Sequence, residues 1–162
     1  MNLYLIRHAD AVPLGEGGME DDADRPLTDA GKAQAAALAK ALAKHGVELD
    51  AILTSPLLRA RQTAEEILKA WTVPATHVHT CDDLALGGRR RRVSRAVEDL
   101  KHESVGLVGH QPDMCEYAAW LIGSRKAQID IAKAGVACIH CDDNPGKGEG
   151  MLEWLITPEW FS

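Results

Sequence analysis

The feature that most constrains the fold is a short apolar run at the N-terminus that ends in two polar residues. Leu3–Ile6 has the length and composition of a buried strand, and Arg7 and His8 follow it directly. Open α/β sheets bind their ligands in a crevice at the carboxyl ends of the strands. The sequence therefore predicts an anion site at this strand end, with His8 as its nucleophile.

Strand-like and helix-like segments alternate over the first two-thirds of the chain. After the first strand the pattern predicts a helix over 30–44, a strand over 50–54, a helix from 55 to about 71, a strand over 76–80, a helix over 89–102, a strand over 104–108 and a helix over 112–123. Thr28 suits the N-cap of the first helix, and Ser55 and Pro56 suit the N-cap and first position of the second.

The last quarter of the chain differs from this alternation. A short strand is predicted over 129–131, and strands over 135–141 and 151–156 are predicted to form a final hairpin. Together these patterns predict an α/β fold of three layers, with a mostly parallel central sheet flanked by helices and a C-terminal antiparallel hairpin.

Length and charge limit the classes of protein that the chain can represent. The 162 residues predict one domain over 1–162, and a net charge of −6 argues against a general nucleic-acid or membrane binder. No apolar stretch approaches the roughly 18 residues of a membrane span, and no signal peptide is visible. We therefore expect a cytoplasmic monomer, with the four cysteines as reduced thiols.

Polar residues follow three of the predicted strands. The first strand leads to Arg7 and His8, the second to Ser55 and a helix that carries Arg59, and the fourth to His110. If these strands lie side by side and run in parallel, their ends converge on one crevice. Guanidinium groups match phosphate oxygens in pairs, and helix N-termini favour anions, so such a crevice suits a phosphoryl group.

The order of these motifs resembles the histidine phosphatase superfamily, which also contains the phosphoglycerate mutases. The matching stretches are Leu5–Ala9, Arg25–Thr28, Gly31, Thr54–Ala60, Gln62–Ala64 and Val108–His110. These stretches lie within residues 1–122. Because the chain is small, it is most similar, within this superfamily, to the SixA-type phosphohistidine phosphatases. One departure from the family pattern is Ala9, which stands where the family usually has glycine.

The resemblance implies a phosphoglycerate mutase-like fold and a metal-independent phosphatase without a cofactor, acting through a phosphohistidine intermediate on His8. The residues it implies to be catalytic are His8, Arg7, Arg59 and His110. Those it implies to bind substrate are Arg7, Ser55, Arg59, His110 and Gln111. The implied partner is a phosphohistidine-bearing signalling or phosphotransfer protein, or a small phosphorylated molecule.

The sequence does not decide which residue, if any, acts as the general acid. Larger relatives use a Glu after the third strand to protonate an alkoxide leaving group, and Asp83 lies at about that place in this chain, next to Asp82. The alternative is that Asp82 and Asp83 simply form a turn. Because imidazole is a better leaving group than an alkoxide, a weak or missing acid fits a phosphohistidine substrate better than a sugar phosphate.

Two other functions remain open. The first is a small-molecule phosphomonoester phosphatase of the same superfamily. The second is a phosphoprotein-binding module without turnover, which the presence of Arg7, His8 and His110 together argues against. A phosphoglycerate mutase is disfavoured, because 162 residues leave little room for the segments that close over its substrate.

Four further features have a functional and a plain interpretation. The acidic loop over 16–24 is either a lid or a solvated surface, and the cations over 89–92 either dock an acidic partner or form a solvated basic turn. Cys138 and Cys141 have zinc-site spacing, but a strand would direct them to opposite faces. The four tryptophans are expected to be buried or half-buried.

Overall fold

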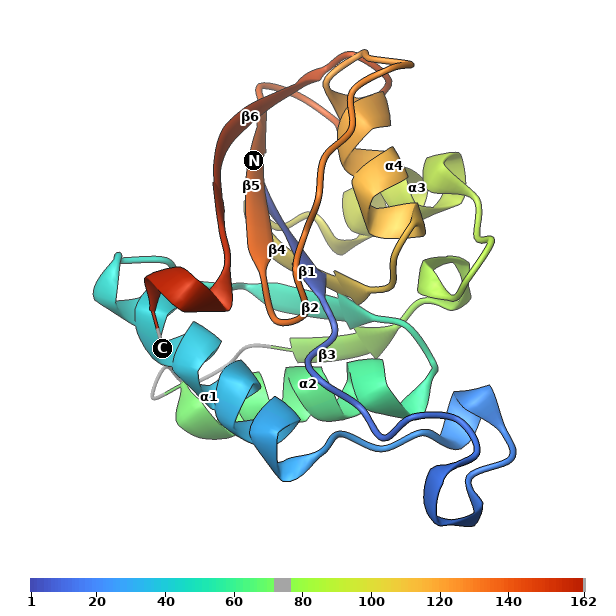
Figure 1. Ribbon diagram of the computed structural model, residues 1–162. Coiled ribbons are helices and arrows are strands. Elements are labelled where there is room, and N and C mark those ends of the chain that lie inside the picture. The colour runs from blue at the N-terminus through green and yellow to red at the C-terminus, as the bar shows by residue number, and fades with distance from the viewer. Residues whose placement is uncertain (72–76, 162) are drawn as a thin grey trace.

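A central β-sheet runs through the molecule (Figure 1). In this computed structural model, which describes residues 1–71 and 77–161, the strand order is β3-β2-β4-β1-β5-β6. The bounds of the strands are β1 (Asn2–Arg7), β2 (Ala51–Thr54), β3 (His77–Thr80), β4 (Ser104–Gly109), β5 (Val136–Cys141) and β6 (Gly150–Ile156). β1 pairs in parallel with β4, β4 with β2 and β2 with β3, whereas β5 is antiparallel to both β1 and β6.

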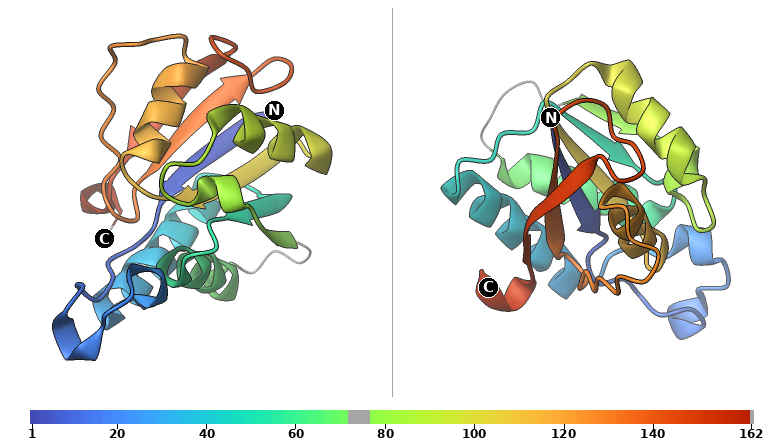
Figure 2. Two further views of the ribbon diagram at one scale, coloured as in Figure 1. Left: turned by 90° about the vertical axis from the view of Figure 1, so that its right-hand side faces the viewer. Right: turned by 90° about the horizontal axis from the view of Figure 1, so that it is seen from above.

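Helices cover both faces of the sheet, as Figure 2 shows. They are α1 (Asp29–Lys44), α2 (Leu58–Ala70), α3 (Arg90–Leu100) and α4 (Asp113–Leu121). Ile6 packs in one core with residues of α1 and α2, and Leu5 packs in the other with residues of α3 and α4. Alternate residues of β1 therefore point to opposite cores, which explains why the strand reads as a continuous apolar run. The predicted three-layer fold, including the final hairpin, is confirmed.

The start of α1 matches the prediction and the start of α2 does not. Thr28 Oγ1 accepts a hydrogen bond from the Gly31 N–H at 3.0 Å, as expected of an N-cap. α2, in contrast, begins at Leu58 with Leu57 as the N-cap residue. The prediction that Ser55 and Pro56 begin this helix is wrong, because Leu57 still has an extended backbone, with a ψ of 138°. Ser55 Oγ accepts a hydrogen bond from the Leu57 N–H at 3.3 Å and also lies 2.8 Å from His110 Nε2.

Three smaller predictions also need correction. Residues 129–131 form no strand, since the Ile131 carbonyl accepts a hydrogen bond from the Arg7 side chain at 3.2 Å. α3 ends at Leu100 because Lys101 adopts a left-handed φ of 55°, and α4 is confined to Asp113–Leu121. The strand predicted over 76–80 is found over His77–Thr80, and its first residue lies outside the described part of the chain.

The cysteines and tryptophans give mixed outcomes. Cys138 and Cys141 are both buried and lie in the two different cores, so the prediction of opposite faces is confirmed. Trp71 is buried, but Trp160 is 81% exposed, which contradicts the expectation of burial for that residue. Trp160 lies in a short 3-10 turn near the C-terminus rather than in a strand or long helix.

Among residues 1–71 and 77–161, no helix is long and apolar enough to cross a membrane.

Candidate active site

The three predicted strand ends meet at one edge of the sheet. Arg7 pairs with Gly109 across β1 and β4, and Thr54 pairs with Val108 across β2 and β4. The residues after these strands, His8, Ser55 and His110, are consequently neighbours. The ring centroids of His8 and His110 are 5.1 Å apart, so two residues that are 102 positions apart in sequence share one pocket.

The His8 side chain is held in one orientation. Its Nδ1 lies 2.7 Å from the Ala9 carbonyl oxygen, which can only accept a hydrogen bond, so Nδ1 carries the proton. Nε2 then carries no proton, and its lone pair accepts a hydrogen bond from Arg59 Nε at 3.3 Å. Burial is the main cause that lowers the pKa of His8 to about 4, and the Arg59 and Arg7 guanidiniums act in the same direction. His8 is therefore neutral near pH 7, with Nε2 as its unprotonated nitrogen.

Arg59 brings a buried guanidinium into the pocket from the first turn of α2. Its side chain is only 3% exposed, and its Nη1 and Nη2 donate to the backbone carbonyl and carboxylate of Asp22 at 2.7 and 3.0 Å. Arg7 is the second cation, held by the hydrogen bond from its Nη1 to Ile131. Its Nε is buried and has no hydrogen-bond partner among the described residues, so this donor is available to an oxyanion.

His110 completes this group of polar side chains. Its Nε2 lies 2.8 Å from Ser55 Oγ, and its Nδ1 is buried without a partner among residues 1–71 and 77–161. Burial, with the charge of Arg59 next in importance, lowers the pKa of His110 to about 3. His110 is thus neutral near pH 7, and an anion bound beside it would raise its pKa.

Two predicted site residues have side chains that contact other parts of the molecule. Gln111 Nε2 donates to Asp130 at 3.1 Å, and Gln111 Oε1 accepts from the Cys115 thiol, so the structure shows no contact of this side chain with His8 or Arg59. Asp83 accepts a hydrogen bond from the Arg89 N–H at 3.0 Å. The Asp83 carboxylate thus engages the start of α3, and its role as a general acid stays a prediction.

The sequence interpretation missed a carboxylate in the pocket. Asp22 Oδ1 lies 2.8 Å from Arg25 Nη1, and Asp22 Oδ2 lies 3.0 Å from Arg59 Nη2. Partial burial would raise the pKa of Asp22, but Arg25 and Arg59 outweigh it and lower the pKa below its ordinary value. The acidic composition of 16–24 was a signal that this loop matters, although it did not single out Asp22.

The turn after His8 depends on Thr63, a residue of the matching stretch Gln62–Ala64 to which the sequence assigned no role. The Ala9 N–H donates to Thr63 Oγ1 at 3.0 Å, and this hydroxyl donates to the Arg59 carbonyl at 2.7 Å. Thr63 thus ties the nucleophile's turn to the helix that carries Arg59. Ala9 is fully buried and does not have a positive φ, so this turn accommodates a Cβ where the family usually has glycine.

This arrangement can bind and attack a phosphoryl group. It combines a neutral imidazole nitrogen, two guanidiniums and a second imidazole with an unpartnered nitrogen. Donors of this kind can hold the oxygens of a phosphoryl group, and an unprotonated imidazole nitrogen can attack phosphorus. No three His, Cys, Asp or Glu side chains are grouped as metal ligands within the described ranges 1–71 and 77–161.

Comparisons with known proteins agree with this geometry. A protein of Picosynechococcus sp., itself uncharacterised, is 38% identical to this chain and covers 99% of both chains. Phosphohistidine phosphatase SixA of Escherichia coli is 27% identical over 98% of this chain and 94% of its own length. The solved structure of the protein histidine phosphatase SixA complexed with tungstate superposes with a TM-score of 0.86, at 27% identity and with full coverage of both chains.

The assignment of the chain to a family rests on a match over most of its length. Residues 3–103 fit the model of the histidine phosphatase superfamily, branch 1, and this range includes His8, Ser55 and Arg59. His110 lies just beyond the matched range and reaches the same pocket through β4. The chain therefore belongs to the histidine phosphatase superfamily.

Proposed function

We propose that this protein is a metal-independent phosphatase that removes the phosphoryl group from phosphohistidine in a signalling or phosphotransfer protein. The observation that carries the proposal is the orientation of His8, whose unprotonated Nε2 lies 3.3 Å from the buried Arg59 guanidinium. The similarity to SixA phosphohistidine phosphatase supports the substrate class.

The proposed reaction has two steps. His8 Nε2 first attacks phosphorus, so that a new N–P bond forms while the N–P bond of the substrate breaks and the substrate imidazole leaves. Water then attacks the phosphorus, the bond to His8 breaks, and inorganic phosphate is released. Arg7, Arg59 and His110 hold the phosphoryl oxygens in both steps.

The leaving group explains why a strong general acid is not needed. A substrate imidazole departs as a neutral molecule when its other nitrogen already carries a proton. The Asp83 carboxylate, the acid expected for an alkoxide, is engaged with the Arg89 N–H at 3.0 Å. This contact favours a substrate with a P–N bond over an alkyl phosphate.

A labelling experiment tests the role of His8. Wild-type protein mixed with radiolabelled phosphoramidate and quenched in alkali should carry label that is released by acid, as expected of phosphohistidine. His8→Ala should lose both the label and the turnover, whereas His45→Ala, a change at an exposed histidine, should keep both. Label or turnover retained by His8→Ala would show that another group is the nucleophile.

A substrate panel tests the class of phosphoryl donor. We expect kcat/KM to be highest for a phosphohistidine peptide, lower for phosphoramidate, and lowest for alkyl phosphate esters of matched size. A clear preference for the esters would contradict the proposal. It would favour the small-molecule phosphatase, and Asp83 would then have to be retested as its acid.

A further inference from the structure

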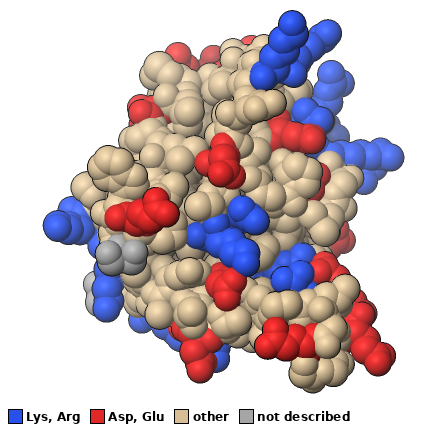
Figure 3. Space-filling model, in the orientation of Figure 1, with Lys and Arg blue, Asp and Glu red and all other residues tan. Residues whose placement is uncertain are grey.

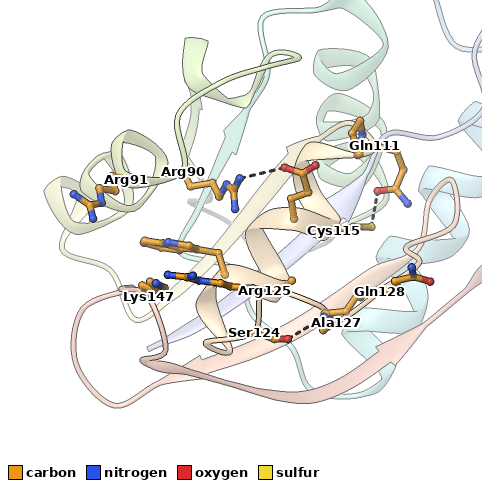
Figure 4. A pocket seen from close by; sticks show the side chains of 14 residues that line it. Arg90, Arg91, Gln111, Cys115, Ser124, Arg125, Ala127, Gln128 and Lys147 are labelled. Atoms are coloured by element: carbon orange, nitrogen blue, oxygen red, sulfur yellow. Dashed lines mark hydrogen bonds and ion pairs between the residues drawn. The ribbon is translucent and has the colours of Figure 1, made fainter.

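A broad groove with basic side chains on its rim lies beside the catalytic pocket. It encloses about 740 Å³ and is bounded by α3, α4 and the segments around 124–129 and 147. Figure 4 shows Arg90 and Arg91 on one side of it and Arg125 and Lys147 on the other. We call this feature the basic groove and define it by these four residues. Pro112, Ala119, Trp120 and Ile129 add apolar surface to it.

The basic groove adjoins the catalytic pocket. Gln111 lines the groove and directly follows His110, and Figure 4 places it with Cys115 at one end of the groove. Residues 129–131 lie on the same side, because Ile129 lines the groove while the Ile131 carbonyl accepts the hydrogen bond from Arg7. A chain that places one residue in the catalytic pocket can therefore continue into the groove.

The charge of the groove differs from that of the whole protein. The net charge is −6, yet Arg91, Arg125 and Lys147 are exposed and make no ion pair with any described residue. Arg90 pairs with Glu116 at 3.3 Å, but both side chains are about half exposed, at 45% and 54%. Figure 3 shows basic side chains at the upper right, over α3 and α4, and acidic ones over the N-terminal loop below. The groove is thus a local cationic surface.

The helix geometry indicates that Arg90 and Arg91 do not stabilise the start of α3. Arg90 and Arg91 are in the first turn of α3, which has no acidic residue, and Arg89 provides no side-chain cap. Cations at a helix N-terminus oppose the helix dipole. Features that oppose local stability are commonly found where function requires them.

We propose that the basic groove binds an acidic segment of the phosphorylated protein whose phosphohistidine enters the catalytic pocket. The inference rests on the proposed function, since it takes the substrate to be a protein. Carboxylates of the segment would pair with the rim cations, and apolar side chains would contact the Trp120 region. Electrostatic complementarity of this kind selects partners and speeds their encounter.

Defined peptides test the proposal without knowledge of the natural partner. The probes are synthetic phosphohistidine peptides of one length, in which the flanking residues are either Asp and Glu or Asn and Gln. The groove variant is R91Q/R125Q/K147Q. The matched control is K32Q/K40Q/K44Q, which removes the same charge from exposed positions on α1, on the other side of the sheet (Figure 1).

Binding is measured first, on protein that also carries His8→Ala, by fluorescence anisotropy at low salt. We expect the acidic peptide to bind at least about tenfold more tightly than the neutral one, as steering by several charges allows. This preference should fall below about twofold in the groove variant and persist in the α1 control. Equal binding of the two peptides, or a preference that survives in the groove variant, would overturn the proposal.

Turnover, measured on protein with His8 intact, separates this inference from the proposed function. We expect the groove variant to lose the preference in kcat/KM for the acidic peptide while its kcat/KM for phosphoramidate stays within about twofold. Selective binding without hydrolysis of any phosphohistidine peptide would support the groove and contradict the phosphatase. Hydrolysis of both peptides at equal kcat/KM would support the phosphatase and contradict the groove.

Discussion

The Asp22 carboxylate lies 3.0 Å from Nη2 of Arg59, the guanidinium that also donates to the nucleophile His8. The same carboxylate lies 2.8 Å from Arg25, so it bridges two cations at the catalytic pocket. Phosphoryl oxygens require donors of the same kind. We therefore predict that Asp22 competes with a bound phosphoryl group and that the loop that carries it changes its contacts with Arg59 when that group binds.

Asp22→Asn should strengthen the binding of anions. Removing the competing charge weakens the contact at Arg59 Nη2, while the contact of Nη1 with the Asp22 backbone carbonyl remains, and we expect the Kd of inorganic phosphate, measured by titration calorimetry, to fall by about three- to tenfold. Asp24→Asn removes the same charge from an exposed position of the same loop and serves as the control. Equal affinities of the two variants would show that Asp22 does not occupy the anion site.

Binding of an oxyanion such as sulfate should be accompanied by proton uptake at mildly acidic pH. Burial and the Arg59 charge lower the pKa of His110 to about 3, so the residue is neutral when no anion is bound. A bound oxyanion raises this pKa, so His110 takes up a proton below the raised value, and affinity weakens as the pH rises through it. Calorimetry in two buffers of different ionisation enthalpy measures the uptake.

The variant His110→Asn identifies the group that takes up the proton. Asparagine keeps a polar side chain but does not titrate, so uptake should disappear in this variant. Uptake that persists in it would assign the proton to His8, whose pKa is also lowered, to about 4. No uptake in the wild-type protein would contradict the prediction altogether.

Stability should fall when the solution is acidified below pH 6.5. Folded His8 has a pKa of about 4, so between pH 4 and 6.5 the unfolded chain binds a proton that the folded chain does not. This difference lowers the free energy of unfolding by at most on the order of 3 kcal/mol at pH 4. Urea unfolding at pH 7, 6 and 5 measures the slope. His8→Asn should reduce the slope by about half, because His110, whose pKa is lowered to about 3, contributes the rest, whereas His77→Asn, at an exposed position, should leave the slope unchanged.

The converging strand ends were predictable from sequence for a simple reason. Arg7, His8 and His110 follow apolar runs directly, and the carboxyl ends of adjacent parallel strands share one edge of the sheet. Local pattern and family motifs therefore led to the same pocket. The contacts of Gln111 and the engagement of Asp83 with Arg89 depend on side-chain directions in loops, which no periodicity encodes.

Asp22 could not be predicted because its position depends on tertiary contacts of an irregular loop. The loop is held by a hydrogen bond from Arg25 Nε to the Val12 carbonyl at 2.7 Å and by one from the Leu27 N–H to Gln62 at 2.7 Å. Ser55 illustrates an error of the other kind, in which a local pattern predicts a feature that the structure does not have. Its residue type and its neighbour Pro56 favour a helix start, but the backbone of Leu57 is still extended and the helix begins only at Leu58.

Thr63→Val should slow catalysis although Thr63 is not placed to touch the substrate. Valine has nearly the same shape but leaves the buried Ala9 N–H without its acceptor, which costs about 1–3 kcal/mol. The turn that orients His8 then loosens, so we expect kcat for phosphoramidate to fall about tenfold while KM changes little. Thr63→Ser keeps the hydroxyl and should restore the rate, measured as formation of the labelled phosphoenzyme. If the valine variant reacts as fast as the wild type while the serine variant reacts slowly, then the packing of the methyl group, and not the hydrogen bond from Ala9, is what positions His8.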